Sequence, residues 1–84
     1  MQAIWKYAIS RTVGDIEMPR GAQILCVQIQ DDDICLWATV NTDAPKEIRT
    51  FVIYGTGHNH PVIEGVHIGT VQQRGLVWHV FEKK

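Results

Sequence analysis

The sequence has no excess of basic residues and no long apolar run. Its 84 residues carry 8 Lys and Arg against 9 Asp and Glu, a net charge of −1. A protein without a basic field has little attraction for a long polyanion, which argues against DNA or RNA as a partner. The first residues do not combine a basic segment with an apolar stretch, and the apolar runs are too short for a membrane span. We therefore expect a soluble, cytoplasmic protein without a membrane partner.

The sequence also lacks the motifs that mark common enzymes. It contains no Gly-x-Ser-x-Gly turn, no Gly-Lys-Ser/Thr phosphate loop and no Cys-x-x-Cys pair. The closest pair of histidines is His58 and His60, with His67 and His79 farther along. A zinc site commonly needs three or four protein ligands, and the cysteines are not spaced to supply them. We expect no metal, no cofactor and no catalysis; a phosphodiesterase that uses His58 and His60 is the enzymatic alternative.

The two cysteines lie in a predicted hairpin that holds them apart. The ranges 24–30 and 34–40 read as strands joined by a two-residue turn at Asp31-Asp32. This register predicts the apolar pairs Ile29/Ile34, Val27/Leu36 and Leu25/Ala38, with Cys26 opposite Trp37 and Cys35 opposite Gln28. Such diagonal neighbours lie about 7–8 Å apart, farther than a disulfide comfortably allows. We expect both thiols to be reduced.

Strands are expected along most of the remaining chain. Four of them are predicted at 3–9, 49–54, 67–73 and 76–82, with a short apolar pair in 14–22, one helical turn at 43–47 and a loop at 58–66. A turn at Arg74-Gly75 predicts the opposite pairs Val71/Trp78, Gly69/Val80, His67/Glu82, Gln72/Val77, Thr70/His79 and Ile68/Phe81. We expect one all-β domain over residues 1–84, a small antiparallel sandwich or barrel of about six short strands.

Two of the predicted strands are apolar on both faces. The range 34–40 places leucine and alanine on one side and Trp37 on the other, and the range 76–82 is also apolar on both sides. A strand with one wet face should alternate apolar and polar residues, so these strands need two covers. No helix is predicted to supply the second cover, and a second copy of the chain is the expected one, which predicts a homo-oligomer. The fold or this interface is expected to bury most of Trp5, Trp37 and Trp78.

The segment from Tyr54 to His60 is the one best suited to binding a ligand. A strand-like run ends there in Gly-Thr-Gly, and glycines let backbone amides approach an anion closely. His58 is either a donor to phosphate, an acid or base, or a plain loop residue. The expected ligand is a small nucleotide-like anion, with Tyr54 stacking on a base and arginines meeting phosphates, Arg20 from a neighbouring chain. The expected ligand-binding residues are Tyr54, Gly55, Thr56, Gly57, His58, His60, Arg20 and Arg49.

Six short segments spread over nearly the whole chain support a comparison with a known family: Ile4-Trp5-Lys6-Tyr7, Met18-Pro19-Arg20-Gly21-Ala22, Cys35-Leu36-Trp37-Ala38, Tyr54-Gly55-Thr56-Gly57-His58, Ile68-Gly69-Thr70 and Trp78-His79-Val80-Phe81-Glu82. In these segments the sequence resembles a family of small, mostly uncharacterised bacteriophage proteins. Small phage proteins of this type include oligomeric sponges that sequester nucleotide-derived immune signalling molecules, such as cyclic oligonucleotides or cyclic ADP-ribose derivatives, without cleaving them. The resemblance implies an anti-defence role of this kind in the cytoplasm of the host cell. A protein-interaction module that inhibits a host protein is the alternative.

Overall fold

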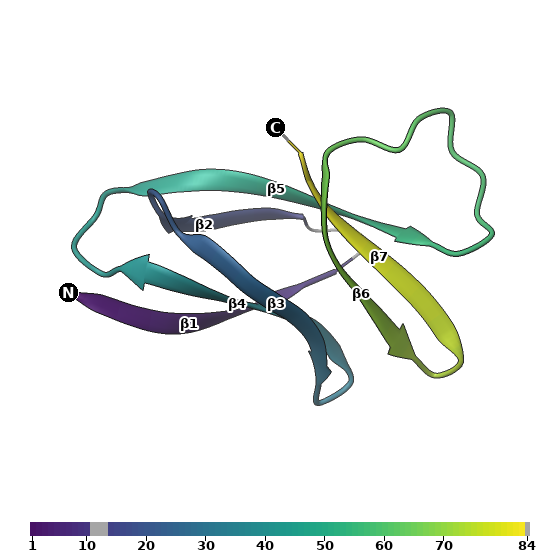
Figure 1. The fold of residues 1–84 in the computed structure, drawn as a ribbon, viewed down its shortest axis with the longest axis horizontal. Coiled ribbons are helices and arrows are strands. Elements are labelled where there is room, and N and C mark those ends of the chain that lie inside the picture. Colours follow the sequence, from purple (N-terminus) through teal and green to yellow (C-terminus); the bar gives the residue numbers. More distant parts are fainter. Residues whose placement is uncertain (11–13, 84) are drawn as a thin grey trace.

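The computed structural model describes residues 1–10 and 14–83, and these residues form seven strands. The strands are β1 (Gln2–Ile9), β2 (Asp15–Pro19), β3 (Gln23–Gln30), β4 (Asp33–Asn41), β5 (Lys46–Gly55), β6 (Val66–Gln73) and β7 (Leu76–Lys83). They make two antiparallel sheets, one with the order β1-β4-β3 and one with the order β2-β5-β7-β6 (Figure 1). The all-β prediction is confirmed, with seven strands in place of about six. No helix among the described residues is long and apolar enough to cross a membrane.

Both predicted two-residue hairpin turns are present. Asp31 and Asp32 have φ of 51° and 65°, and Arg74 and Gly75 have φ of 52° and 80°. Positive φ at both central residues is the geometry whose twist matches a right-handed pair of strands. Next to these turns the predicted registers hold, with Ile29 opposite Ile34 in the first hairpin. In the second hairpin the pairs Gln72/Val77, Val71/Trp78 and Thr70/His79 are as predicted.

Farther from the turns, a bulge shifts each register. In β3 the bulge at Leu25 places Ile24, and not Leu25, opposite Ala38. In β6 the ladder shifts between His67 and Gly69. The observed pairs there are His67/Phe81 and Val66/Glu82, so the predicted pairs His67/Glu82 and Ile68/Phe81 are wrong. A bulge adds one residue to one strand and bends it, and alternation in the sequence does not reveal it.

The two bulged strands lie where the sheets meet. Gly69 of β6 lies directly against Val27 of β3. A Cβ built on Gly69 would lie only 2.8 Å from the Val27 Cβ. Only glycine allows this close approach of the two strands. The core then fills with apolar side chains from both sheets: Ile9, Val27, Ile34, Leu36, Ala38 and Val40 from one, and Phe51, Val71, Trp78 and Val80 from the other, with Met18 of β2.

An ion pair lies among these core side chains. The Arg49 guanidinium donates to both Glu82 carboxylate oxygens, at 2.7 and 2.9 Å, and also to the Ala22 carbonyl. The Arg49 side chain is 16% exposed and that of Glu82 is 11% exposed. The hydrogen bond to Glu82 raises the pKa of Arg49 above its ordinary value, against the opposing effect of burial. Glu82 therefore pairs with Arg49 across the sheet and not with His67.

Two further expectations meet a different outcome. The segment predicted as one helical turn at 43–47 is not helical, since β5 begins at Lys46 and a short turn precedes it. Of the three tryptophans, Trp78 is buried in the core, Trp37 is half-buried and Trp5 is exposed at the edge strand β1. Trp5 is therefore not buried by the fold of one chain, and its burial in an oligomer interface stays a prediction. Cys26 and Cys35 are free thiols, as expected.

Candidate functional site

The glycine bend begins where β5 ends. The Thr56 amide donates to the Val77 carbonyl at 3.1 Å, and the His58 amide donates to the Gly55 carbonyl at 3.2 Å. Gly57 has φ of 86°, a conformation that glycine adopts without strain. Two of the amides expected to hold an anion are therefore bonded to protein carbonyls. Within the described part of the chain, the amides of Gly57, Asn59 and His60 have no such carbonyl partner.

The His58 side chain is exposed and contacts the buried Trp78 at the inner side of the four-stranded sheet. Its ring centroid is 6.1 Å from that of Trp78, in an edge-to-face arrangement. A Cβ on Gly55 would lie 2.7 Å from the His58 ring and 2.9 Å from Trp78, so Gly55 makes room for both rings. The role of Gly55 in the bend is thus to allow a packing contact between His58 and Trp78.

Tyr54 and His60 lie on the opposite, outer side of the same sheet. Tyr54 is 8% exposed, with its ring 4.8 Å from that of His60 and 5.5 Å from that of Phe81. Its hydroxyl accepts a hydrogen bond from the Glu64 amide at 3.2 Å. Residues 56–65 therefore fold over Tyr54, which leaves no open ring face for a base to stack on.

The positions of these rings separate the two closest histidines. His58 contacts Trp78, which lies opposite Gly55 in the ladder, and His60 contacts Tyr54. Neighbouring residues of a strand point to opposite faces, so Trp78 and Tyr54 lie on opposite sides of the sheet. One ion cannot be shared by two imidazoles placed in this way. Among residues 1–10 and 14–83, no group of three or more histidine, cysteine or acidic side chains is arranged to hold a metal ion.

A chain of hydrogen bonds crosses the outer side of the four-stranded sheet beside the bend. Thr56 Oγ1 is 2.7 Å from His79 Nε2, and His79 Nδ1 is 3.0 Å from Thr70 Oγ1. Thr70 Oγ1 is in turn 2.8 Å from His67 Nε2. We call Thr56, His79, Thr70 and His67 the histidine–threonine row. The predicted opposite pair Thr70/His79 is confirmed and is joined by a hydrogen bond, and the row extends this pair at both ends.

The row combines groups that donate and accept hydrogen bonds. Both ring nitrogens of His79 are bonded to threonine hydroxyls, which fixes the plane of the imidazole. His67 is held from below by an edge-to-face contact with Phe81, with centroids 5.3 Å apart. Thr56, Thr70 and His67 are exposed and His79 is half-buried. The row therefore presents a fixed set of polar groups to solvent.

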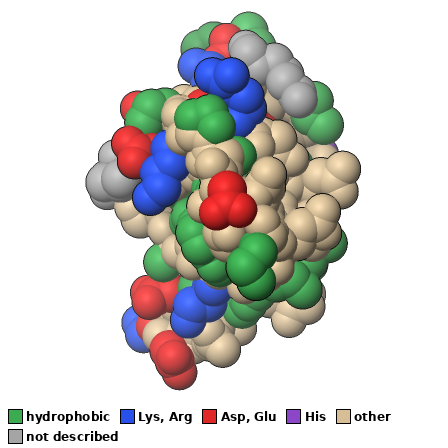
Figure 2. Space-filling model, turned by 90° about the vertical axis from the view of Figure 1, so that its left-hand side faces the viewer, with side chains coloured by type: hydrophobic (Ala, Val, Ile, Leu, Met, Phe, Trp, Pro, Cys, Tyr) green, Lys and Arg blue, Asp and Glu red, His purple; other side chains and the backbone are tan. Residues whose placement is uncertain are grey.

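The two arginines expected at the site lie elsewhere in the chain. Arg49 is in the core with Glu82. Arg20 is in the turn between β2 and β3, with its Nε 3.7 Å from the Glu47 carboxylate. Figure 1 places this turn and the loop between β5 and β6 at opposite ends of the molecule. Figure 2 looks at the end that holds the β2–β3 turn, where side chains of both charges are interspersed and no basic patch forms.

Sequence reasoning missed Thr70 and His67 as site residues, although a signal for them was present. The predicted hairpin register already placed Thr70 beside His79. Thr56 joins them only because β5 and β7 are neighbours, and His67 joins them only because of the bulge in β6. Neither feature can be read from one hairpin.

A comparison of the chain with families of known proteins gives one match. Residues 1–84 match the model of a family described as a domain of unknown function, DUF7352. The chain belongs to the DUF7352 family. No curated protein and no solved structure matches it. Membership of the DUF7352 family assigns neither a reaction nor a ligand, so the site is interpreted from its geometry.

Proposed function

We propose that the protein binds a small phosphorylated, nucleotide-like molecule at the histidine–threonine row and does not convert it. The observation that carries the proposal is the unbroken chain of three hydrogen bonds from Thr56 through His79 and Thr70 to His67. Gly57, whose φ is 86°, directly follows Thr56 in the exposed part of the glycine bend. The row offers hydroxyl and imidazole groups on one surface, and the proposal adds the Gly57 amide to them.

Phosphate oxygens suit this set of donors. They accept hydrogen bonds from hydroxyls, from imidazoles and from backbone amides in a bend. A threonine hydroxyl that accepts a hydrogen bond from an imidazole keeps its own proton free to donate to an added anion. A row fixed before the ligand arrives loses little conformational entropy when it binds. A small anion fits this arrangement better than a long polyanion, because the net charge of the chain is −1.

Binding without conversion is the better-supported alternative. In a hydrolase, a nucleophile and its base are commonly oriented by a third group, often a carboxylate that stabilises the charged imidazole. The Thr56–His79 pair has the distance of such a pair, but His79 is oriented by the neutral Thr70 hydroxyl. The phosphodiesterase alternative with His58 and His60 is disfavoured by their separation across the sheet.

The ligand class that we place first is that of nucleotide-derived immune signals, cyclic oligonucleotides and cyclic ADP-ribose derivatives among them. The support for this choice is the resemblance of six sequence segments to small bacteriophage proteins. We include in the proposal that the protein acts as a homo-oligomer, in which Arg20 of one copy can approach the row of another. Arg20 suits this role because it is exposed and only loosely tied to Glu47. A role as inhibitor of a host protein remains the competing proposal, with the exposed apolar side chains in its favour.

Isothermal titration of the protein against a panel of cyclic nucleotides and ADP-ribose derivatives tests the proposal. Thr56→Val removes one hydroxyl of the row and keeps the side-chain shape, and it should weaken binding about tenfold, the equivalent of one hydrogen bond to a charged group. Thr42→Val is the matched control, since Thr42 is an exposed threonine whose hydroxyl donates to the Met1 carbonyl far from the row. No heat with any compound at concentrations well above micromolar contradicts the proposal.

The fate of the ligand separates binding from catalysis. A bound compound should be recovered unchanged after the protein is denatured, as judged by mass spectrometry. Recovery of a cleaved product, lost in His79→Gln, would establish an enzyme instead.

A further inference from the structure

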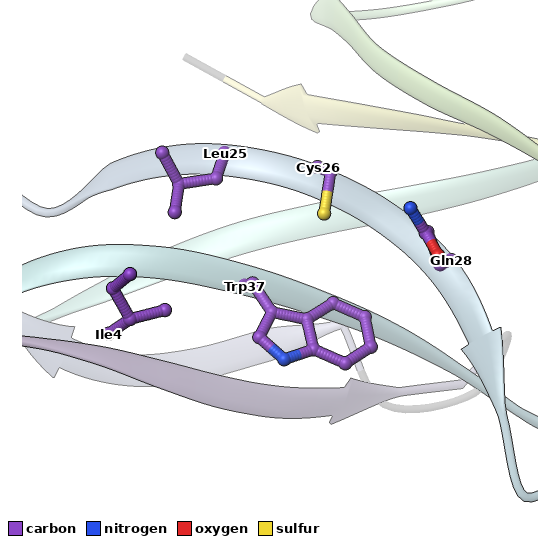
Figure 3. A pocket seen from close by; sticks show the side chains of 5 residues that line it. All are labelled: Ile4, Leu25, Cys26, Gln28 and Trp37. Atoms are coloured by element: carbon purple, nitrogen blue, oxygen red, sulfur yellow. The ribbon is translucent and has the colours of Figure 1, made fainter.

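The outer face of the three-stranded sheet is polar along its margins, and its centre is apolar and partly exposed. Its centre is formed by Ile4 of β1, Leu25 and Cys26 of β3, and Trp37 of β4, which line a shallow hollow of about 320 Å³ together with Gln28 (Figure 3). Ile4 is 62% exposed and Leu25 is 53% exposed. Exposed apolar side chains gathered in this way mark an interaction surface in many soluble proteins. We call Ile4, Leu25, Cys26 and Trp37 the bare face.

The bulge in β3 contributes directly to this surface. Cys26 lies opposite Trp37, and Ile24 lies opposite Ala38 on the inner face. The extra residue, Leu25, has no partner on β4, and its side chain lines the hollow beside Cys26. A regular strand would have turned one of these two residues toward the core. The bulge therefore adds a leucine side chain to the outer face. There it stays exposed, so it contributes nothing to the stability of the monomer.

We propose that the bare face binds the bare face of a second copy of this chain, in a two-fold symmetric dimer. This inference does not depend on the ligand of the histidine–threonine row. A two-fold interface brings a surface against itself, so each side must be complementary to its own copy. An apolar centre meets that condition for any orientation about the axis.

The charges around the bare face also suit a second copy. Lys6 and Asp33 are the charged residues of the outward rows of β1 and β4, and they oppose one another in sign. The Lys6 ammonium already donates to Gln30. Two copies of a face with no net charge meet without like-charge repulsion, whereas a charged partner would find no complementary field here.

The size of the face sets the strength of the dimer. Three strands of about eight residues measure roughly 14 by 26 Å from the usual strand spacing and rise. That footprint lies below the roughly 800 Å² per partner of a standard stable interface. We therefore expect a weak dimer, with a dissociation constant in the micromolar range or above.

Sedimentation velocity over a range of protein concentrations tests the dimer with two matched variants. Leu25→Glu places a like charge on both copies at the centre of the interface and should hold the protein at monomer mass at every concentration. Leu76→Glu is the control, because Leu76 is 52% exposed at the start of β7 in the other sheet. It should associate like the unmodified chain. Both leucines are exposed in one chain, so neither change should prevent folding, which circular dichroism checks.

A second measurement reports on the bare face itself. Alkylation of the half-buried Cys26 should slow as protein concentration rises, while the buried Cys35 should stay slow throughout. The inference is overturned if the unmodified chain is monomeric at about millimolar concentration, well above the expected range. It is also overturned if Leu76→Glu and Leu25→Glu affect association equally. Leu25→Glu leaves the row itself intact, so ligand binding that survives in this monomeric variant would show that the row binds without Arg20 of a second copy, and would keep the two proposals separate.

Discussion

The outer faces of the two sheets both carry an aromatic side chain, Tyr54 on one and Trp37 on the other, and they differ in how that side chain is covered. On the four-stranded sheet, Tyr54 is covered by residues 56–65, and His60 packs on its ring. On the three-stranded sheet, no loop among the described residues folds over the half-buried Trp37 in this way, and the neighbouring Ile4 stays exposed. One outer face is closed by a described loop, and the other is the face that we propose binds a second copy.

The difference follows from the lengths of the connections between the strands. The connection at 56–65 is the longest between strands, and it crosses one sheet only. The hairpin turns at 31–32 and 74–75 are too short to cover anything. No other connection between the described strands is long enough to cover the outer face of the three-stranded sheet. The proposed dimer would remove that face from water.

Both outer faces depend on a firmly held interior, and the largest expected effect comes from Glu82→Ala, which breaks the ion pair between β5 and β7 of the four-stranded sheet. The change leaves the Arg49 guanidinium in the core without its carboxylate, which costs about 3–5 kcal/mol when one partner of a buried pair is removed. Urea unfolding followed by tryptophan fluorescence measures the loss. The double variant Arg49→Met with Glu82→Leu should recover most of it. A loss below about 1 kcal/mol would mean that the pair is solvated, as exposed pairs are.

Truncating one aromatic residue on each outer face sharpens the contrast between a covered and a bare surface. Tyr54→Ala removes a buried ring and should destabilise the monomer by about 3–4 kcal/mol. Trp37→Ala removes a larger but half-buried ring, and its cost to the monomer should be about half as large. Unfolding is measured at low concentration, where the proposed dimer is dissociated. Equal losses would show that Trp37 is as well covered within one chain as Tyr54.

The sequence predicted the regular parts of this fold because local chemistry determines them. Alternation located the strands, and the dipeptides Asp31-Asp32 and Arg74-Gly75 set both hairpin turns. The bulges at Leu25 and Ile68 were missed, since they depend on how β3 meets β6 at the Gly69–Val27 contact. That contact joins residues far apart in sequence and has no local signature.

The candidate site shows the same division. The segment from Tyr54 to His60 was identified from its glycines. One of its residues, Thr56, belongs to the histidine–threonine row, and Gly57 follows Thr56 in the chain. The environment of Tyr54 was not predictable, because it depends on the path of a ten-residue loop with no regular structure. Arg49 was assigned to a ligand because a buried partner 33 residues away cannot be read from one strand.

Removing one hydroxyl from each sheet should change stability in opposite directions. Tyr7→Phe should stabilise the protein by about 1 kcal/mol, because the buried Tyr7 hydroxyl has no hydrogen-bond partner among the described residues. Tyr54→Phe should destabilise it by a similar amount, about 1 kcal/mol, since this hydroxyl accepts from the Glu64 amide. Thermal unfolding of the two variants beside the unmodified chain measures both signs. Stabilisation by both changes would contradict the contact that closes the covered face.

The same tyrosine predicts how stability changes at alkaline pH. Burial raises the pKa of Tyr7 above its ordinary value. The folded state therefore keeps a proton that the unfolded chain loses near pH 10, so stability is full below about pH 10 and falls as the pH rises further. Tyr7→Phe should reduce this fall. An identical alkaline decline in the variant would mean that other groups cause it.

The smallest expected effect concerns the turn at the tip of the three-stranded sheet. Asp31 has φ of 51°, and asparagine adopts this conformation more readily than aspartate in turns of this type. Asp31→Asn should stabilise the protein by about half a kcal/mol, at the lower end of what such backbone changes give. Asp33→Asn is the control, because it removes the same charge from the same acidic tip but from a residue in β4. If the control stabilises equally, relief of repulsion between carboxylates explains the gain, and the conformation of the turn does not. A larger gain for Asp31→Asn assigns the difference to the backbone of this turn. In the corresponding turn of the four-stranded sheet, the second residue is a glycine, Gly75.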